Sequence, residues 1–493
     1  MWGKAVICGN FAWDEIAKKN KPDENQLLLT PHLIRELVDV RVKHVVTSPV
    51  ACHSVIISED GDVWVFGRNG RGQLGLGHHN SVDYPVRVKS TFESHIEIGD
   101  RKIVAAAVGR NHTLLVSESG EVFGTGDNRL GQLTFAGDGY KSFKRLTSLN
   151  KEKIVQVACG AEFTLVLNDQ GKVFAFGSQE YGQLGNGADG QFIKSAGTLA
   201  TRPQERPLLV KALIERNIVS IACGANHSLA MDDGGYVYSW GFGGYGRLGH
   251  GEQKDLFAPQ VISKLAGPGR ATRASAIACG SSCSMALDGT NQLLMWGKWK
   301  NTGDGSSGQP WMSPKYLYDL NGWSFLTMAA GARSLFAVAD TEPTTVAWGQ
   351  VANSELGYGD EAPARSSTRP QKVEPLEGIV TLGVSAGVGH TLFLVKPDNE
   401  LVQDLPKWPA TETDDFCVKC RKDDNEDKIL LCDKCDASTH TYCAVPPLQE
   451  IPEGDWYCDK CHPPQEETPK PAPPRKGQVA TGDKVPSKRQ KTK

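Results

Sequence analysis

The chain has 493 residues and a formal net charge of −3, a balance that excludes broad nucleic-acid affinity along its whole length. No apolar run approaches the roughly 20 residues that a membrane span needs, and the first residues show no secretory pattern, so we expect neither membrane contact nor secretion. Seven of the 13 cysteines lie between residues 417 and 461, and such clustering favours metal ligands over disulfides.

One pattern recurs through most of the chain. It is clearest at ACGANHSLAMDDGGYVYSWGFGGYGRLGHG (222–251), where two short apolar runs flank DDGG (232–235) and a glycine-rich loop follows. Glycine adopts the positive φ that tight hairpin turns require, so the pattern predicts a β-hairpin. A single hairpin is not stable alone in water, and this one must therefore pack against other copies.

Six further copies, some of them incomplete, follow at steps of roughly fifty to sixty residues, the period of propeller or solenoid arrays. They begin at Cys52, Gly109, Ala158, Ala278, Ala329 and Ser385. The last copy lacks its closing strand, and AVICG (5–9) supplies one from the N-terminus. A ring closed by two half-repeats leaves no exposed sheet edge. The sequence therefore predicts an all-β fold, with a seven-bladed β-propeller over residues 1–405.

Three features interrupt or decorate this repeat. LTPHLIRELV (29–38) predicts a short helix, capped by Thr30, that covers one face of the propeller. The polar insertion 186–206 lacks the alternation of paired strands, and it is interpreted either as a functional loop or as a mobile connection. A histidine followed by Ser or Thr recurs at one repeat position, which predicts a structural hydrogen bond within each blade; these histidines are His53, His112, His227 and His390.

The repeats GAEFTLVLNDQGKVFAFGSQEYGQLG (160–185) and SWGFGGYGRLGHGEQKD (239–255) resemble the regulator-of-chromosome-condensation repeat family, and most of all its second, telophase-disc branch. The resemblance covers about four fifths of the chain. It implies a propeller whose faces bind other proteins, among them small GTPases and chromatin.

Eight potential metal ligands follow the repeats in four pairs, each with two residues between its members. The pairs are Cys417 and Cys420, Cys432 and Cys435, His440 and Cys443, and Cys458 and Cys461. This spacing lets two side chains face one tetrahedral metal, and two Zn²⁺ ions need eight nitrogen or sulfur ligands. No ligand is left over, so we expect two structural Zn²⁺ ions that carry most of the folding energy of a small module.

The ligand order, four Cys, one His and three Cys, with Trp456 two residues before Cys458, resembles a plant homeodomain (PHD) finger. The resemblance implies an interleaved, cross-brace assignment: Cys417, Cys420, His440 and Cys443 at one zinc, and Cys432, Cys435, Cys458 and Cys461 at the other. Spacing alone does not fix this pairing. We expect a linker over 406–413, the finger over 414–464 and a disordered basic tail over 465–493.

The finger is acidic. Between Thr411 and His462 there are 13 Asp and Glu against six Lys and Arg, a balance that repels phosphates and attracts a basic peptide. The segment KILL (428–431) is β-prone, and in PHD fingers it pairs edge to edge with the N-terminal tail of histone H3. The alternative is that the acidic residues only solvate a zinc fold.

The resemblance also implies individual histone contacts. Asp433 and Asp436 match the positions that bind the arginine at the histone's second residue, and Asp415 matches the position that binds its unmodified fourth-residue lysine. Ser438 stands where readers of trimethyl-lysine place a cage Trp, so the unmodified tail is favoured. The predicted contact set is Asp415, Ile429, Leu430, Leu431, Asp433, Asp436, Glu453, Gly454 and Trp456.

Two basic clusters in the tail resemble a bipartite nuclear import signal, which places the protein in the nucleus. They comprise Arg475, Lys476, Lys488, Arg489 and Lys491. The same charges are able to contact the DNA backbone, and the alternative is that they only keep the tail soluble.

Two functions from different classes stay open. The first is a monomeric, non-enzymatic chromatin adaptor whose finger binds histone H3 and whose propeller binds a protein partner. The second is a guanine-nucleotide exchange factor for a small GTPase of the Rac, Ral or Ran type, with the finger as its targeting module. The Ran-directed relative is implied to use a protruding β-hairpin wedge, and the insertion 186–206 gives no sign of one.

Overall fold

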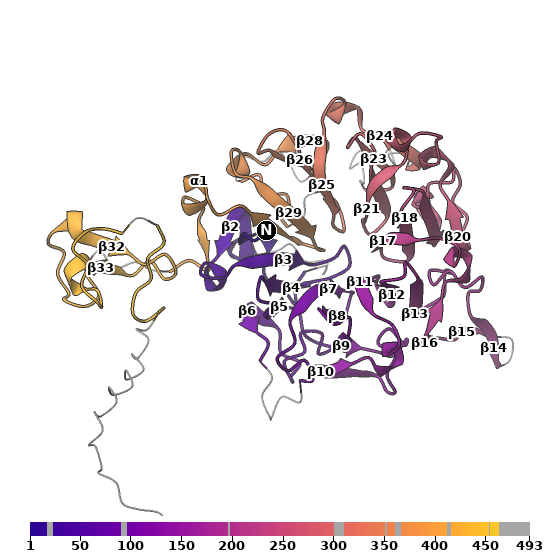
Figure 1. Ribbon diagram of the computed structural model, residues 1–493, viewed down its shortest axis with the longest axis horizontal. Coiled ribbons are helices and arrows are strands. Elements are labelled where there is room, and N and C mark those ends of the chain that lie inside the picture. Colours follow the sequence, from indigo (N-terminus) through magenta and orange to yellow (C-terminus); the bar gives the residue numbers. More distant parts are fainter. Residues whose placement is uncertain are drawn as a thin grey trace, which may run out of the picture. The chain divides into compact units, whose positions relative to one another are not determined.

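Seven sheets, antiparallel except for one parallel pair in the last, stand around a central axis in the N-terminal unit, Met1–Ala410, of this computed structural model (Figure 1). A second unit covers Thr411–Lys493. The structure describes residues 1–16, 23–89, 96–195, 198–299, 310–350, 353–359, 366–411, 416–452 and 454–462. The predicted all-β, seven-bladed propeller is therefore confirmed.

Six blades have four strands each, and within each blade strands that follow one another in the sheet pair antiparallel. The first three blades are β3 (Val42–Val46), β4 (His53–Ser58), β5 (Val63–Gly67) and β6 (Val82–Arg87); β7 (Ile103–Val108), β8 (His112–Ser117), β9 (Val122–Asp127) and β10 (Gly139–Arg145); and β11 (Ile154–Cys159), β12 (Phe163–Asn168), β13 (Val173–Gly177) and β16 (Gln204–Leu209). The next three are β17 (Ile218–Cys223), β18 (His227–Asp232), β19 (Val237–Gly241) and β20 (Leu256–Val261); β21 (Ala274–Cys279), β22 (Cys283–Asp288), β23 (Leu293–Gly297) and β24 (Trp311–Tyr316); and β25 (Phe325–Ala330), β26 (Ser334–Ala339), β27 (Thr345–Gln350) and β28 (Ser366–Lys372).

The seventh blade joins the two ends of the propeller. Its strand order is β29 (Thr381–Ala386), β30 (His390–Val395), β1 (Lys4–Asn10), β2 (Leu27–Ile34) and β31 (Lys407–Trp408). The N-terminal strand β1 pairs antiparallel with β30, with Lys4 opposite Val395 and Gly9 opposite His390. The closure predicted from the two half-repeats is therefore confirmed.

The predicted helix over residues 29–38 is wrong. This segment forms β2, which pairs with β1 through Leu33 opposite Val6, and only Arg35–Leu37 makes a single 3-10 turn. The spacing of its apolar residues suits either structure. In the closing blade, β1 has a free edge that must pair with another strand. This tertiary pairing overrides the local propensity for a helix.

The insertion 186–206 contains a two-stranded hairpin that sequence reasoning missed. Strands β14 (Gln191–Ser195) and β15 (Thr198–Thr201) pair only with each other and project from the third blade (Figure 1). Ile193 lies directly opposite Leu199, and the two are 70% and 62% exposed. The polar residues around this pair hid the alternation in the sequence.

Part of the expected linker belongs to the propeller. Strand β31, inside residues 406–413, runs parallel to β2, and Trp408 is buried against Phe11 and Tyr84 with ring centroids 5.5 and 5.0 Å away. Helix α1 (Glu400–Gln403) precedes it. Nowhere in the described part of the chain is a helix long and apolar enough to cross a membrane.

Short 3-10 turns connect the strands elsewhere. They are Glu24–Gln26, Arg35–Leu37, Thr147–Leu149, Lys211–Leu213, Gly244–Gly246, Ser263–Leu265, Arg270–Thr272, Tyr318–Leu320, Glu374–Leu376, Glu426–Lys428 and Thr441–Cys443. The last two belong to the second unit, together with the hairpin of β32 (Ile429–Leu431) and β33 (Ser438–His440).

The four repeated histidines hold neighbouring blades together. Each Nε2 shares a hydrogen bond with a hydroxyl on the next blade: His53 with Thr113 at 2.8 Å, His112 with Thr164 at 3.2 Å, His227 with Ser284 at 2.9 Å and His390 with Ser54 at 2.7 Å. The predicted bond within each blade is thus a bond between blades. Burial lowers the pKa of His53 and of His390 to about 3, so these rings are neutral at physiological pH.

Candidate metal centres and peptide-binding edge

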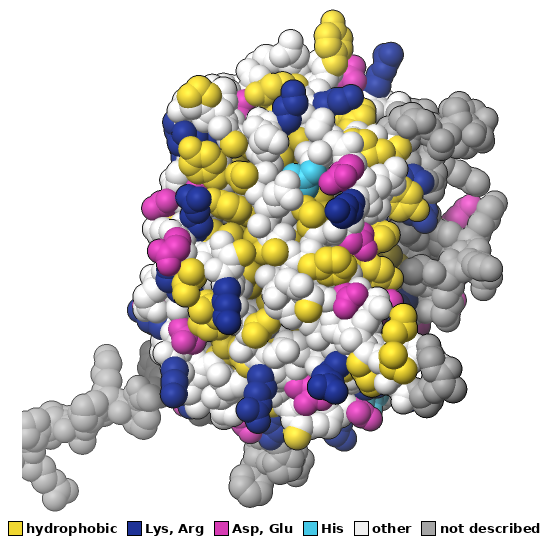
Figure 2. Space-filling view, turned by 90° about the vertical axis from the view of Figure 1, so that its right-hand side faces the viewer, with side chains coloured by type: hydrophobic (Ala, Val, Ile, Leu, Met, Phe, Trp, Pro, Cys, Tyr) yellow, Lys and Arg dark blue, Asp and Glu magenta, His cyan; other side chains and the backbone are white. Residues whose placement is uncertain are grey.

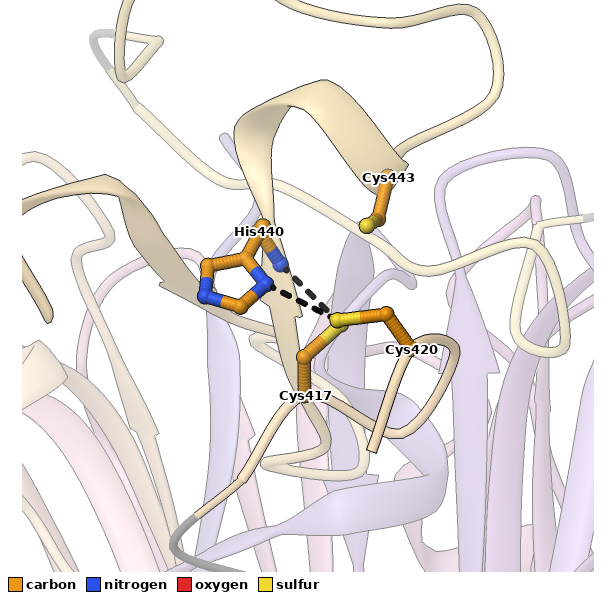
Figure 3. A group of neighbouring side chains, drawn as sticks. All are labelled: Cys417, Cys420, His440 and Cys443. Carbon is orange, nitrogen blue, oxygen red and sulfur yellow. Dashed lines mark hydrogen bonds between the residues drawn. The ribbon is translucent and has the colours of Figure 1, made fainter. Parts of the chain in front are cut away.

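Four side chains from separate parts of the finger converge on one point (Figure 3): Cys417, Cys420, His440 and Cys443. Their potential ligand atoms all lie within 4.8 Å of one another, and Cys420 Sγ is 3.3 Å from His440 Nδ1. The backbone N–H of His440 donates to Cys417 Sγ at 3.4 Å. The end of β33 and the first CxxC turn therefore share one centre.

The other ring nitrogen of His440 fixes how the imidazole is presented. Nε2 donates to the carbonyl oxygen of Asp424, which leaves Nδ1 unprotonated and directed at the thiols. The ring of Tyr442 stacks on the imidazole with centroids 4.7 Å apart. Sequence reasoning missed both supports. The sequence does show an aromatic residue, Tyr442, two positions after the histidine, which could have predicted the stacking. It gives no indication that the Asp424 carbonyl accepts from the ring.

The second cluster comprises Cys432, Cys435, Cys458 and Cys461. Cys435 Sγ lies 3.6 Å from Cys458 Sγ, and the backbone N–H of Cys458 donates to Cys432 Sγ at 3.3 Å. Thiolates on one tetrahedral zinc are separated by roughly this distance, because each Zn–S bond is about 2.3 Å long.

The thiol pKa values differ within each cluster. Burial alone would raise the pKa of Cys417, but backbone N–H groups of Cys420, His440 and Lys419 lower it to about 6. Burial and the neighbouring thiols raise the pKa of Cys443 to about 11. Only a bound cation makes several adjacent thiolates compatible, so the donor chemistry suits Zn²⁺.

The structure thus brings together the two ligand sets of the interleaved, cross-brace assignment, and the finger holds two structural zinc ions. Each ion supplies a cross-link between distant parts of a short segment. With four protein ligands available per metal, neither centre has an open position for chemistry.

Strand β32 has one paired edge and one open edge. It pairs with β33 through Leu430 opposite Thr439, and the N–H of Cys432 donates to Ala437 O at 3.1 Å in the same hairpin. Because backbone groups alternate along a strand, those of Ile429 and Leu431 point away from β33. No strand pairs with that side among the residues that the structure describes.

The side chains of β32 divide between the finger's interior and its surface. Leu430 is 5% exposed, Ile429 is half-buried, and Leu431 is 58% exposed. Gly454 is exposed and has φ of +96°, the left-handed region that favours glycine in a tight turn.

Asp433 links two parts of the finger. One of its carboxylate oxygens accepts the backbone N–H of Trp456 at 2.6 Å, and its own N–H donates to Trp456 O at 2.9 Å. Asp436 has φ of +55° and is half-buried, and the Thr411 hydroxyl donates to its Oδ2 at 3.4 Å. Both acids therefore lie just beyond β32, at the end of the hairpin.

Several predicted site residues lie outside the described residues. These are Asp415, Glu453, Arg475, Lys476, Lys488, Arg489 and Lys491.

Comparisons with known proteins agree with this geometry. A family model for the RCC1-like domain matches residues 1–393, and a PHD-finger model matches residues 417–461. The chain therefore belongs to the RCC1-like family and carries a PHD finger after its propeller. The resemblance predicted from the repeats and from the ligand order is confirmed.

The relatives share most of the chain. The RCC2 homologue of Danio rerio is 39% identical over 432 residues, 83% of each chain. Protein RCC2 of Homo sapiens is 38% identical over 432 residues, which cover 82% of this chain and 79% of that protein. The crystal structure of Prp20p from Saccharomyces cerevisiae shows the same fold, with a TM-score of 0.65, 20% identity and coverage of 82% of this chain and 94% of that one.

Proposed function

We propose that this chain is a nuclear chromatin adaptor: its PHD finger binds the unmodified N-terminus of histone H3, and its propeller binds a protein partner. The observation that carries the proposal is the open edge of β32. An extended peptide that pairs there bonds with the outward backbone groups of Ile429 and Leu431 and completes a three-stranded sheet.

The side chains around this edge support a basic peptide. Asp433 and Asp436 lie beyond one end of β32, where a guanidinium has two carboxylates within reach. Asp415 is proposed as the partner of the fourth-residue lysine. Ser438, at the usual cage position, is 4% exposed and offers no aromatic wall for a methylated ammonium.

Calorimetry of the full chain with H3 peptides tests the proposal. Asp436→Asn keeps the size of the side chain and removes its charge, so binding should weaken by about tenfold or more. Glu450→Gln is the matched control, because it removes an exposed charge outside the predicted contact set. Equal loss in both variants would show that the charges act only through the net field of the finger.

The modification preference is tested with the same peptides. We expect the unmodified peptide to bind more tightly than the peptide with trimethylated fourth-residue lysine. The opposite order would contradict the proposed reader class.

Nuclear accumulation is proposed to depend on the basic tail. A fluorescent fusion that lacks residues 484–493 should lose nuclear accumulation, and an unchanged distribution would contradict this role.

A second candidate function is nucleotide exchange on a small GTPase, and the hairpin of β14 and β15 favours it. The hairpin projects from the third blade with the exposed pair Ile193 and Leu199, the kind of protruding wedge that the family resemblance implies for exchange on Ran. Prp20p has been described as binding Gsp1p and histones.

Nucleotide release from a panel of Ran, Rac and Ral GTPases tests this second candidate. Exchange by the wild-type chain that is lost in the double variant Ile193→Ser with Leu199→Ser would establish it. No acceleration of any GTPase would leave the adaptor as the function of the propeller.

A further inference from the structure

The innermost strand of every blade carries a β-bulge near its start. In β25, for example, Leu326 lies between residues that pair with Ala339 and Val338, and it has no partner of its own. A bulge bends the strand and re-aims a side chain. The bulged residues are Lys43, Val104, Val155, Val219, Ser275, Leu326 and Leu382. Because the seven strands surround the central cavity, these residues form a ring at one end of it.

Five of the seven bulged residues are apolar, and three of these are exposed: Val155, Val219 and Leu326. Leu326 exposes the largest fraction, 56%. Exposed apolar groups that lie together mark interaction surfaces, whereas scattered single ones need no explanation. The ring therefore indicates a binding face, and the charges beside it indicate the kind of partner.

On the sixth and seventh blades three further exposed apolar residues extend the ring outward. They are Pro343, Val380 and Leu401. The N–H of Gly378 donates to Pro343 O at 3.1 Å, and a Cβ atom at Gly378 would lie 3.0 Å from Leu401 Cδ1. Val380 follows Gly378 by two residues. We call Leu326, Pro343, Val380 and Leu401 the apolar stripe.

The turn that carries Pro343 also joins the apolar stripe to β25. The N–H of Asp340 donates to Ser324 O at 2.9 Å, and the Ser324 hydroxyl donates to Asp340 Oδ2 at 3.2 Å. Ser324 lies two residues before Leu326. The apolar stripe therefore runs over one connected group of turns, from the sixth blade to the seventh.

Exposed acids border the apolar stripe. Lys372 pairs with Glu377 at 2.5 Å, and Lys396 pairs with Asp398 at 2.8 Å. Four further acids form no ion pair with any residue that the structure describes, and they leave the border negatively charged. These are Asp340, Glu342, Glu374 and Glu400.

The charges differ elsewhere on the propeller. At the same end of the first two blades, arginines neutralise acids in the pairs Arg41 and Glu59, Arg87 and Asp62, and Arg101 and Glu121. Exposed bases and acids are mixed around Val155 and Val219: Lys153, Asp169, Arg216 and Asp233. Lys and Arg are also interspersed with Asp and Glu on the side of the propeller shown in Figure 2. Exposed apolar residues together with unpaired acids therefore distinguish the apolar stripe.

We propose that the apolar stripe and its acidic border bind a basic amphipathic segment of a partner protein. This inference rests on the proposed function, in which the propeller binds a protein partner, and it names the chemistry of that partner. The surface shares no residue with the histone-binding finger.

An apolar and acidic surface does not suit nucleic acid or an anionic lipid surface. Both carry phosphates, which the unpaired carboxylates repel. A protein segment with apolar side chains beside lysines or arginines matches the apolar stripe in both respects. Its apolar groups cover Leu326, Val380 and Leu401, and its cations reach the acids of the border.

Fluorescence anisotropy with the full chain and a fluorescein-labelled amphipathic peptide of leucine and lysine tests the proposal. Leu326→Ser with Val380→Ser should weaken binding by about fivefold or more, because it removes the apolar contact. Glu342→Gln with Glu400→Gln should weaken binding to a similar degree and reduce its dependence on salt. All four side chains are exposed, so the fold is expected to persist.

Val155→Ser with Val219→Ser is the matched control. It removes two exposed apolar groups from the same ring of bulged residues, away from the acidic border, and should bind as wild type. The acidic finger also attracts a basic peptide, but this contribution is common to all variants. Wild-type affinity in both test variants, or an equal loss in the control, would overturn the proposal. So would equally tight binding of a peptide in which glutamates replace the lysines.

The experiment also recognises other occupants of the apolar stripe. A wild-type dimer in sedimentation that Leu326→Ser with Val380→Ser converts to a monomer would show that a second copy covers the surface. Tighter peptide binding after removal of residues 465–493 would show that the chain's own basic end covers it. Either result would overturn the assignment to a partner protein.

Histone H3 binding, measured in parallel by calorimetry, should be unchanged in all these variants. Loss of the peptide effect with intact H3 binding would contradict the apolar stripe alone. Absence of H3 binding with the peptide effect intact would contradict the histone reader alone.

Discussion

The propeller and the finger hold short strands together by different means. Between the third and fourth blades, Phe163, Leu165 and Trp240 are fully buried in one apolar layer, and equivalent layers recur around the ring. In the finger, β32 and β33 have three residues each, and Leu430 is the one apolar side chain of β32 that is buried. Coordination of metal by eight ligands replaces an apolar core in the finger.

The two units also treat their strand edges differently. The propeller pairs β1 with β30 and so closes its ring, whereas β32 keeps an open edge. Metals hold the finger without help from a third strand, so its edge is left for a peptide. Stability is therefore spread over many contacts in the propeller and concentrated at the two metal centres in the finger.

Removing zinc should have the largest effect on stability, and it should unfold the finger while the propeller stays folded. We expect a strong chelator to release two equivalents of zinc per chain and to unfold the finger, because structural zinc contributes about 10–16 kcal/mol to small zinc domains. The thermal transition of the propeller should not move. Metal release measured with a colorimetric zinc indicator, followed by calorimetry, checks both statements, and a lowered propeller transition would contradict them.

Truncating an aromatic side chain in the propeller core should have the opposite effect: it should destabilise the propeller and leave the finger folded. Trp240 is fully buried and its Nε1 donates to Gln183 O at 2.8 Å, so Trp240→Ala should lower the free energy of unfolding of the propeller by about 3–5 kcal/mol. Zinc content should stay unchanged. Tyr318→Ala, at a residue 87% exposed, is the control and should have little effect.

A smaller effect, dependent on pH, is expected at the histidines between blades. Burial lowers the pKa of His112 from 6.5 to about 4, so between these values the unfolded chain binds a proton that the folded chain excludes. The stability that comes from the neutral His112 is therefore fully present above about pH 6.5 and is lost as the pH falls toward 4.

His112→Phe tests this account, because blade three carries Phe163 at the same position. Gly109 lies against the His112 ring as Gly160 lies against Phe163, so the larger ring has a precedent. We expect a cost of about 1 kcal/mol at neutral pH and a smaller loss of thermal stability on acidification. Unchanged acid sensitivity would contradict the role of this group.

The smallest effect on stability is expected at the projecting hairpin. Ile193→Ser with Leu199→Ser removes exposed apolar groups, so the free energy of unfolding should change by no more than about 0.5 kcal/mol per site. Denaturant unfolding checks this. A large loss would show that the hairpin packs as part of the blade.

Repetition made most of the propeller predictable. Each blade repeats the same turn glycines and the same apolar runs, so single ambiguities average out, and the half-repeats at residues 5–9 and 385–402 identified the closing blade. The eight zinc ligands were predictable because tetrahedral coordination restricts both residue type and spacing.

The features that were wrongly predicted or missed depend on contacts between residues far apart in the sequence. Residues 29–38 have apolar spacing that also suits a helix, and only the pairing with β1 in the seventh blade makes them strand β2. The direction of the histidine bonds depends on blade contacts that no local pattern encodes. In the finger, the bonds of Asp433 to the Trp456 backbone join residues 23 positions apart, and the sequence offered no signal for them.

Hydrogen exchange at single amides shows whether the finger binds the histone H3 N-terminus by adding a strand to β32. On addition of the unmodified H3 peptide to the full chain, exchange of the outward amides of Ile429 and Leu431 should slow by about tenfold or more, while that of Leu430, already paired with β33, should change little. Unchanged exchange at Ile429 and Leu431, with the peptide bound, would contradict the claim.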